Sequence, residues 1–189
     1  IRGHEPEVHS NTGGQPAKAT PRGAVAKFSA GGKASAKKDL AMFAMSYENV
    51  YVAQVAYAAK DVQTLKAFQE AESFPGTSII IAYAPCIAWG NDLVDNHQMQ
   101  DLAVRSGHWP LLRYDPRRHE QGLNPLQLDS KPPSIAYRDF VGNETRFNML
   151  WRSHPAEPEQ FLNASQHEVS ARYHHYHQLA SLGHSPAEN

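Results

Sequence analysis

The sequence has little cysteine, no long apolar run and no excess of charge of either sign. Its 189 residues include one cysteine, Cys86, which excludes an internal disulfide and any C-x-x-C pair for zinc or dithiol chemistry. No apolar run approaches the roughly 20 residues that span a bilayer, and no signal peptide opens the chain. The 18 basic and 19 acidic residues nearly cancel, so we expect neither nucleic acid nor a membrane as a partner. These absences favour a protein of the reducing cytoplasm.

The composition is that of a folded domain. Hydrophobic residues make up 41% and charged residues 20% of the chain, which is close to globular usage. We expect a partial α/β domain with a basic N-terminal loop over residues 1–134 and a helical extension over residues 135–189. The sequence starts at Ile1 without a methionine, and we expect it to be a piece of a longer polypeptide.

Helix and strand patterns alternate from residue 39 onward. The spacing predicts strands over 50–55, 77–84 and 109–114, and helices over 39–46, 61–74, 92–106, 137–151 and 158–182. The strand over 77–84 is nearly all apolar, as is typical of a central strand covered on both faces. Residues 115–134 are rich in proline and polar residues, which predicts a surface wrap. The alternation indicates an α/β fold with a parallel sheet and carboxyl-terminal helices.

Two glycine-rich segments near the N-terminus are candidate anion sites. Residues 31–35 read Gly-Gly-Lys-Ala-Ser, but a Walker motif needs glycine in place of Lys27 and serine or threonine in place of Ala34, so it fails twice. The segment Asn11-Thr12-Gly13-Gly14 allows two interpretations. Its amides can hold a diphosphate or orient a substrate carbonyl, or it is an ordinary Asn-Gly turn.

Cys86 lies in a turn at the carboxyl end of the apolar strand, where open α/β sheets usually bind ligands. Its spacing alone favours a small buried apolar side chain, and leaves a nucleophile or a metal ligand open. An iron-sulfur cluster takes four thiolates, so three would have to come from elsewhere. His174 and His177 can share a helical face, but without acidic or cysteine neighbours they predict a solvated surface.

Taken in order, the motifs of the chain resemble one known family. They are Ser10-Asn11-Thr12-Gly13-Gly14-Gln15, Gly23-Ala24-Val25-Ala26-Lys27-Phe28, Asn49-Val50-Tyr51-Val52-Ala53, Ile80-Ile81-Ala82-Tyr83-Ala84-Pro85-Cys86-Ile87, Gly107-His108-Trp109-Pro110-Leu111 and Asn124-Pro125-Leu126-Gln127-Leu128-Asp129-Ser130-Lys131. This series is similar to the carboxyl-terminal thiamine diphosphate-binding domain of the pyruvate:ferredoxin (flavodoxin) oxidoreductases. The resemblance extends from about Glu7 to Leu182 and implies a fragment of such an enzyme.

The resemblance implies an oxidoreductase that uses thiamine diphosphate, Mg²⁺ and [4Fe-4S] clusters. Members of the family convert pyruvate and coenzyme A into acetyl-CoA and carbon dioxide, and pass the electrons one at a time to ferredoxin or flavodoxin. We expect the complete enzyme to be a homodimer in the cytoplasm, and this fragment to be inactive without the remainder of its parent chain.

Four site residues follow from the resemblance, each matched to a motif position. Asn11 is the expected catalytic residue, beside thiamine diphosphate and pyruvate, and Thr12 is the next cofactor-binding position. Val8 is expected to offer its backbone carbonyl to Mg²⁺, an oxygen ligand that suits a hard cation. Cys86 corresponds to one thiolate ligand of the cluster nearest the thiamine.

Some positions depart from the family pattern. Pro6 stands where the family has a magnesium-binding threonine, His9 where it has tyrosine, and Glu48 where it has glycine. Because proline has no side-chain oxygen, that magnesium contact is absent here. Two alternatives therefore remain open: a non-catalytic remnant or assembly module of the same fold, and a relative that acts on another 2-oxoacid.

Overall fold

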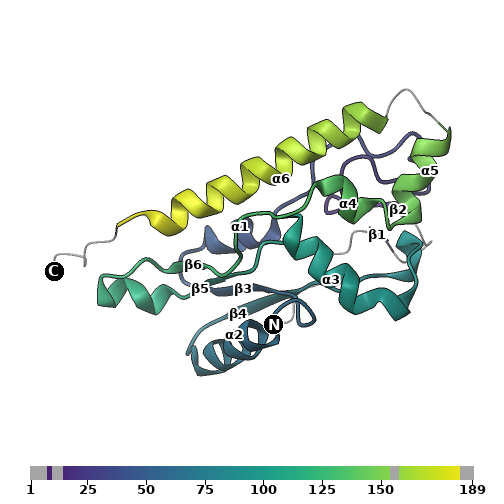
Figure 1. Ribbon diagram of the computed structural model, residues 1–189. Coiled ribbons are helices and arrows are strands. Elements are labelled where there is room, and N and C mark those ends of the chain that lie inside the picture. The colour runs from purple at the N-terminus through teal and green to yellow at the C-terminus, as the bar shows by residue number, and fades with distance from the viewer. Residues whose placement is uncertain (1–7, 10–14, 154–157, 184–189) are drawn as a thin grey trace.

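A computed structural model describes residues 8–9, 15–153 and 158–183. Figure 1 shows a sheet with the helix α2 (Asp61–Ser73) on one side and the long helix α6 (Pro158–Ser181) on the other. Within these residues no helix combines the length and the apolar composition needed to cross a membrane. The order of strands and helices confirms the expected α/β class with carboxyl-terminal helices.

Four strands form the main sheet in the order β4-β3-β5-β6. Their bounds are Tyr51–Val55 for β3, Ser78–Ala82 for β4, Leu112–Tyr114 for β5 and Leu126–Leu128 for β6. Strands β3 and β4 run parallel and are connected through α2, whereas β5 runs antiparallel to both β3 and β6. The sheet is therefore mixed, and the parallel arrangement expected from the alternating pattern holds for the β3–β4 pair.

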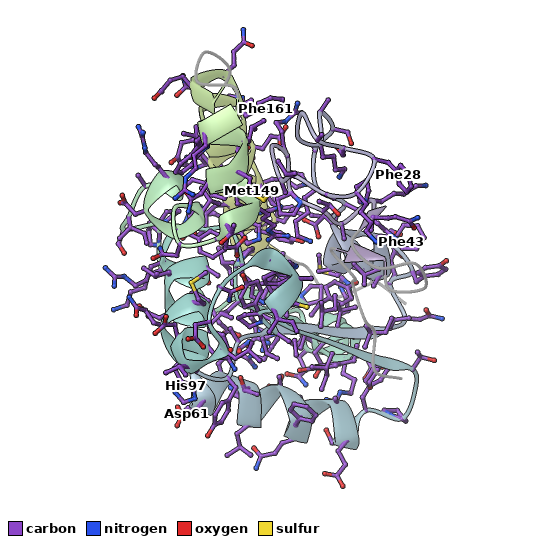
Figure 2. All side chains as sticks on the ribbon, turned by 90° about the vertical axis from the view of Figure 1, so that its right-hand side faces the viewer. Phe28, Phe43, Asp61, His97, Met149 and Phe161 are labelled. Carbon is purple, nitrogen blue, oxygen red and sulfur yellow. The ribbon has the colours of Figure 1, made fainter. Side chains whose placement is uncertain are left out.

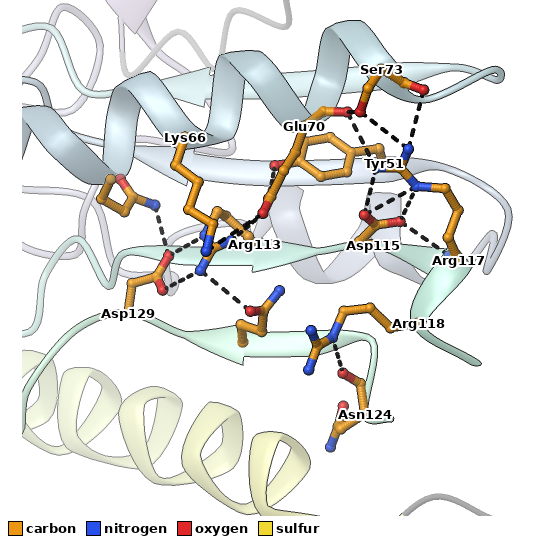
Figure 3. A network of polar contacts seen from close by, with 12 residues as sticks. Tyr51, Lys66, Glu70, Ser73, Arg113, Asp115, Arg117, Arg118, Asn124 and Asp129 are labelled. Atoms are coloured by element: carbon orange, nitrogen blue, oxygen red, sulfur yellow. Dashed lines mark hydrogen bonds and ion pairs between the residues drawn. The ribbon is translucent and has the colours of Figure 1, made fainter. Parts of the chain in front are cut away.

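Helix α2 covers one face of the sheet over a small apolar core formed by Tyr51, Ala53, Val55 and Ala67. A buried polar network closes this layer (Figure 3). The guanidinium of Arg113 in β5 lies 2.6 Å from Glu70 of α2 and 2.8 Å from Asp129, and the Tyr51 hydroxyl donates to Glu70 at 2.9 Å. Burial, together with the Glu70 charge, raises the pKa of Tyr51. The network therefore joins α2 to three other segments of the chain, which are β3, β5 and the residues after β6.

The larger core lies on the opposite face, under α1 (Leu40–Met45) and α6. Asp39 begins α1 by accepting a 3.0 Å hydrogen bond from the amide of Met42, as an N-cap residue does. The hydroxyl of Tyr176, a fully buried residue of α6, donates to the same carboxylate at 2.8 Å. One carboxylate thus caps α1 and anchors α6. The expected boundary at residue 134, between the partial α/β domain and the helical extension, stays a prediction.

The remaining elements refine the expected pattern. The helix expected over 92–106 is a short 3₁₀ helix, η2 (Leu93–Asp95), followed by α3 (Asn96–Arg105). The helix expected over 137–151 is divided into α4 (Tyr137–Val141) and α5 (Thr145–Ser153). Residues 115–134, expected only to wrap the surface, contain the 3₁₀ helix η3 (Pro116–Gln121) and the strand β6.

The basic loop before α1 is organised by Lys33. Its ammonium group donates to the carbonyls of Lys18, Thr20 and Ala36 at 2.6–3.0 Å. A lysine held by three backbone carbonyls acts as an internal brace, which agrees with the failed Walker match. Phe28 is 91% exposed on this loop, on the same side of the molecule as Phe43 in Figure 2.

Candidate functional site

The candidate site is the turn after β4, which carries Cys86. Cys86 is exposed and has extended backbone angles. Its carbonyl accepts a 2.9 Å hydrogen bond from the amide of Trp89, and so begins the 3₁₀ helix η1 (Ile87–Trp89). Exposure of the residue contradicts the interpretation of Cys86 as a buried apolar side chain, and leaves its thiol accessible to a ligand.

Aromatic packing fixes the position of this turn. Trp89 is only 6% exposed, and its ring centre lies 5.8 Å from that of Tyr83, which in turn lies 5.1 Å from that of Trp109. The guanidinium of Arg146 stacks over the Trp89 ring at 4.4 Å, a distance at which cation and ring attract each other. The turn is therefore held rigidly from its buried side, while Cys86 is exposed.

Arg146 also connects the turn to the N-terminal loop. Its Nε donates to Glu144 at 2.6 Å, and both side chains are almost fully buried, at 4% and 0% exposure. The backbone carbonyl of Arg146 accepts a 3.0 Å hydrogen bond from the amide of Val25. One residue of α5 thus meets the Cys86 turn through Trp89 and the loop through Val25.

A cleft of about 230 Å³ lies between these three segments. It is lined by Thr20, Val25, Ala26, Lys27, Ala88, Arg146 and Met149. Lys27 and Arg146 are the basic residues of its lining, and Glu144 balances the charge of Arg146. Ala88 on its wall is two residues from Cys86, so the cleft and the thiol belong to the same region of the chain.

The other expected site residues fall near the N-terminus. Val8 lies in the strand β1 (Val8–His9), opposite Pro16 in the antiparallel strand β2 (Gln15–Pro16). Figure 1 shows this strand pair at the same end of the molecule as α5. Asn11 and Thr12 lie outside the described residues, so their expected roles stay predictions.

The donor atoms of the chain fit one ligand of an iron-sulfur cluster, and do not make up a whole set. Cys86 is the single cysteine of the sequence. Among residues 8–9, 15–153 and 158–183, no group of three or more histidine, cysteine or acidic side chains gathers as a metal site. His174, His175 and His177 are exposed on α6. A cluster at Cys86 would therefore need three thiolates from other polypeptide.

Sequence reasoning missed the residues that hold the turn. Gly90 ends η1 with a positive φ of 78°, and its carbonyl accepts a 2.7 Å hydrogen bond from the Thr145 hydroxyl. The Gly90-Asn91-Asp92 segment gave a turn signal that could have located it. No sequence pattern marks the contact of Arg146 with Trp89, because the two residues are far apart in the chain.

Comparison with known proteins places these features in a family. No family model matches the chain. Pyruvate-flavodoxin oxidoreductase from Nostoc sp. is 54% identical over 175 residues, which are 93% of this chain and 15% of that protein. Pyruvate:ferredoxin oxidoreductase from Moorella thermoacetica is 47% identical, and the probable pyruvate-flavodoxin oxidoreductase of Escherichia coli 46%, each over 174 residues that make up 92% of this chain and 15% of the relative.

The fold and the turn show a mixed α/β segment with an exposed thiol after a parallel strand. The relatives show which known proteins contain a similar segment. The chain is homologous, over nearly its whole length, to one part of the pyruvate-flavodoxin and pyruvate:ferredoxin oxidoreductases, and it spans about 15% of their length.

Proposed function

We propose that this chain supplies part of the thiamine diphosphate site and one cluster thiolate to a pyruvate:ferredoxin or pyruvate:flavodoxin oxidoreductase. The parent enzyme would convert pyruvate and coenzyme A into acetyl-CoA, carbon dioxide, one proton and two electrons. The electrons would leave singly to ferredoxin or flavodoxin through iron-sulfur clusters. Exposure of Cys86 on a fixed turn, within a segment 54% identical to the Nostoc enzyme, carries this proposal.

Cys86 is the proposed cluster ligand. An accessible thiol on a turn held by Trp89 and Gly90 can bind iron without rearrangement of the backbone, and such rigidity keeps the ligand oriented. The three other thiolates would come from the remainder of the parent chain. This chain without that remainder is accordingly proposed to be inactive.

Val8 is the proposed magnesium ligand, through its carbonyl oxygen. Its register neighbour in β2 is Pro16, which has no amide hydrogen and cannot donate to that carbonyl. A backbone carbonyl oxygen is a ligand that suits a hard cation. Asn11 and Thr12 complete the proposed cofactor contacts, with the Asn11 amide donating to the reacting oxygen of the substrate. Thiamine diphosphate, when bound, supplies the carbanion that attacks the keto carbon and accepts the electrons of decarboxylation.

Substitution of Cys86 tests the proposal in a complete enzyme, the Nostoc relative with its matching 175 residues replaced by this chain. Cys86→Ser should remove the iron of one cluster and stop pyruvate-dependent reduction of flavodoxin. Ile87→Val, which changes a residue of the same turn that is 70% exposed, is the matched control and should keep both. Unchanged iron content and cluster spectrum in Cys86→Ser would refute the ligand role.

Substitution of Asn11 tests the catalytic role separately. Asn11→Ala should raise the activation barrier by about 2 to 4 kcal/mol if the amide supports developing oxyanion charge. The effect should appear in kcat, with little change in thiamine diphosphate binding measured by titration. A wild-type rate with pyruvate would remove Asn11 from the site. The choice of 2-oxoacid is tested in the natural parent enzyme of this chain, where faster turnover of 2-oxoglutarate than of pyruvate would assign the enzyme to another 2-oxoacid.

A further inference from the structure

Strand β4 combines an interior sequence with an edge position. It contains the run Ser-Ile-Ile-Ile-Ala, yet it is the terminal strand of the sheet, with β3 as its one neighbour among the described strands. Exposed apolar edge strands are rare in native proteins because they pair with other chains. The two observations conflict unless another strand covers this edge.

Both faces of β4 are already packed. Ile81 is 1% exposed and belongs with Ile79 to the large core under α1 and α6. Ile80 points to the opposite face and packs on the small core under α2. Apolar side chains on both faces are characteristic of an interior strand of a parallel sheet, because strands at the edge of such sheets are usually more polar. Ala82, by contrast, is exposed.

The hydrogen bonds of β4 show which backbone groups face outward. The Thr77 carbonyl accepts from the amide of Tyr51, and the amide of Tyr83 donates to Val55, both at 3.0 Å. Odd-numbered residues of this segment therefore direct their backbone groups toward β3. Because the direction alternates along a strand, Ile80 and Ala82 direct their N–H and C=O groups at the outer edge.

We propose that the outer edge of β4 binds a parallel strand from the part of the parent oxidoreductase that lies outside this chain. The relatives contain the partner polypeptide, since this segment is 15% of their length. A parallel strand fits the apolar pattern of both faces. It also brings its carboxyl end to the end of the sheet that carries Cys86, where further thiolates are needed; this second reason rests on the proposed function.

Helix α2 indicates that the partner is larger than a strand. It packs on β3 and β4, and on its outer side Val62, Leu65 and Phe68 are 71%, 61% and 46% exposed. These residues recur at helical spacing and so form one apolar stripe. A folded portion of the parent protein that adds a strand to β4 can also cover this stripe, whereas a short peptide would leave it in water.

Residue-resolved hydrogen exchange tests the added strand. In this 189-residue chain the amides of Ile80 and Ala82 should exchange rapidly. In the complete enzyme with this segment in place they should exchange about 100-fold more slowly, while Ile79 and Ile81 are protected in both. Equal exchange of Ile80 and Ala82 in the two proteins would overturn the proposal. Protection that rises with the concentration of this chain, together with a dimeric mass, would overturn it in favour of pairing between two copies.

A proline substitution gives an independent test. Ala82→Pro removes an outward N–H, and Ala82→Val is the control that keeps it. In this chain both variants should melt within a few degrees of wild type. In the complete enzyme only Ala82→Pro should restore fast exchange at Ile80. The proposal fails if Ile80 stays protected there, and an Ala82→Pro variant that does not fold leaves the wild-type exchange comparison decisive. Neither measurement depends on catalysis.

Discussion

The hydroxyl of Thr145 donates a 2.7 Å hydrogen bond to the carbonyl of Gly90, although the two residues are 55 positions apart. This contact joins the first residue of α5 to the end of the turn that carries Cys86. Gly90 has a φ of 78°, and a side chain added there would collide with Thr145. Both the backbone angle and the close approach therefore require glycine.

Gly90→Ala should accordingly lower the free energy of unfolding by about 2 to 4 kcal/mol, because it adds steric overlap to a left-handed backbone angle. Urea unfolding followed by circular dichroism measures the change. Gly31→Ala is the matched control, since nothing lies within 4 Å of the added carbon at Gly31, and it should shift stability by less than about 0.5 kcal/mol. Equal stability of the two variants would contradict the role assigned to Gly90.

Glu48→Gly should stabilise the chain. Glu48 has a φ of 61°, a left-handed conformation that costs a residue with a side chain about 1 kcal/mol and glycine almost nothing. The resemblance implies glycine at this position, and glycine adopts this backbone angle without steric cost. We expect a gain of about 1 kcal/mol in urea unfolding.

The same variant has a second readout. Burial raises the pKa of Tyr114, and the charge of Glu48 adds to that effect, so Glu48→Gly should lower the pKa of Tyr114 in a spectroscopic titration. Glu72→Gly is the control at an exposed helical position, and should destabilise because glycine is unfavourable inside helices. A loss of stability in Glu48→Gly would show that the left-handed angle costs nothing here.

Asp115 should make stability depend on pH in the acid range. Burial acts to raise its pKa, but side-chain and backbone hydrogen bonds from Arg117 outweigh burial and hold the pKa below its ordinary value of 3.8. The carboxylate therefore stabilises the fold above about pH 4, and this stability is lost as the pH falls through the lowered pKa.

Asp115→Asn should be less stable than wild type by about 1 to 3 kcal/mol at pH 7, and the difference should shrink below pH 4. Urea unfolding at several pH values measures it. Asp101→Asn, which changes an exposed carboxylate paired with Arg105 on α3, should show a smaller difference at pH 7. A constant difference between Asp115→Asn and wild type from pH 7 to pH 2 would contradict the linkage.

The local elements of the fold were accessible from the sequence, because hydrophobic periodicity reports which faces of a segment are covered. It located β3, α2 and β4 closely. It could not show that β4 lies at the edge, since packing on two faces does not reveal whether a neighbouring strand is present. The direction of β5 and the existence of β6 also escaped, because each has three residues, and pairing between distant strands decides both.

The candidate site was predictable only in part. The apolar strand before Cys86 located its turn, but the apolar neighbours of the cysteine also suited a buried side chain, and only the packed structure showed its exposure. Trp89 and Arg146 meet through tertiary packing alone. The anion-binding interpretation of the Asn11 turn still depends on the resemblance, because that turn lies outside the described residues.

The buried pair of Glu144 and Arg146 should behave as one unit. Arg146→Met removes the 2.6 Å hydrogen bond to a carboxylate that is 0% exposed, and also the cation that stacks on Trp89. Loss of one member of a buried ion pair costs about 3 to 5 kcal/mol, because the other charge stays desolvated, whereas replacement of both members often costs far less.

Glu144→Leu with Arg146→Met should therefore be more stable than Arg146→Met by itself. Urea unfolding of the two single variants and the double variant gives the interaction energy. Additive losses would show that each side chain acts independently, and that the connection between the loop and the Cys86 turn does not depend on their pairing.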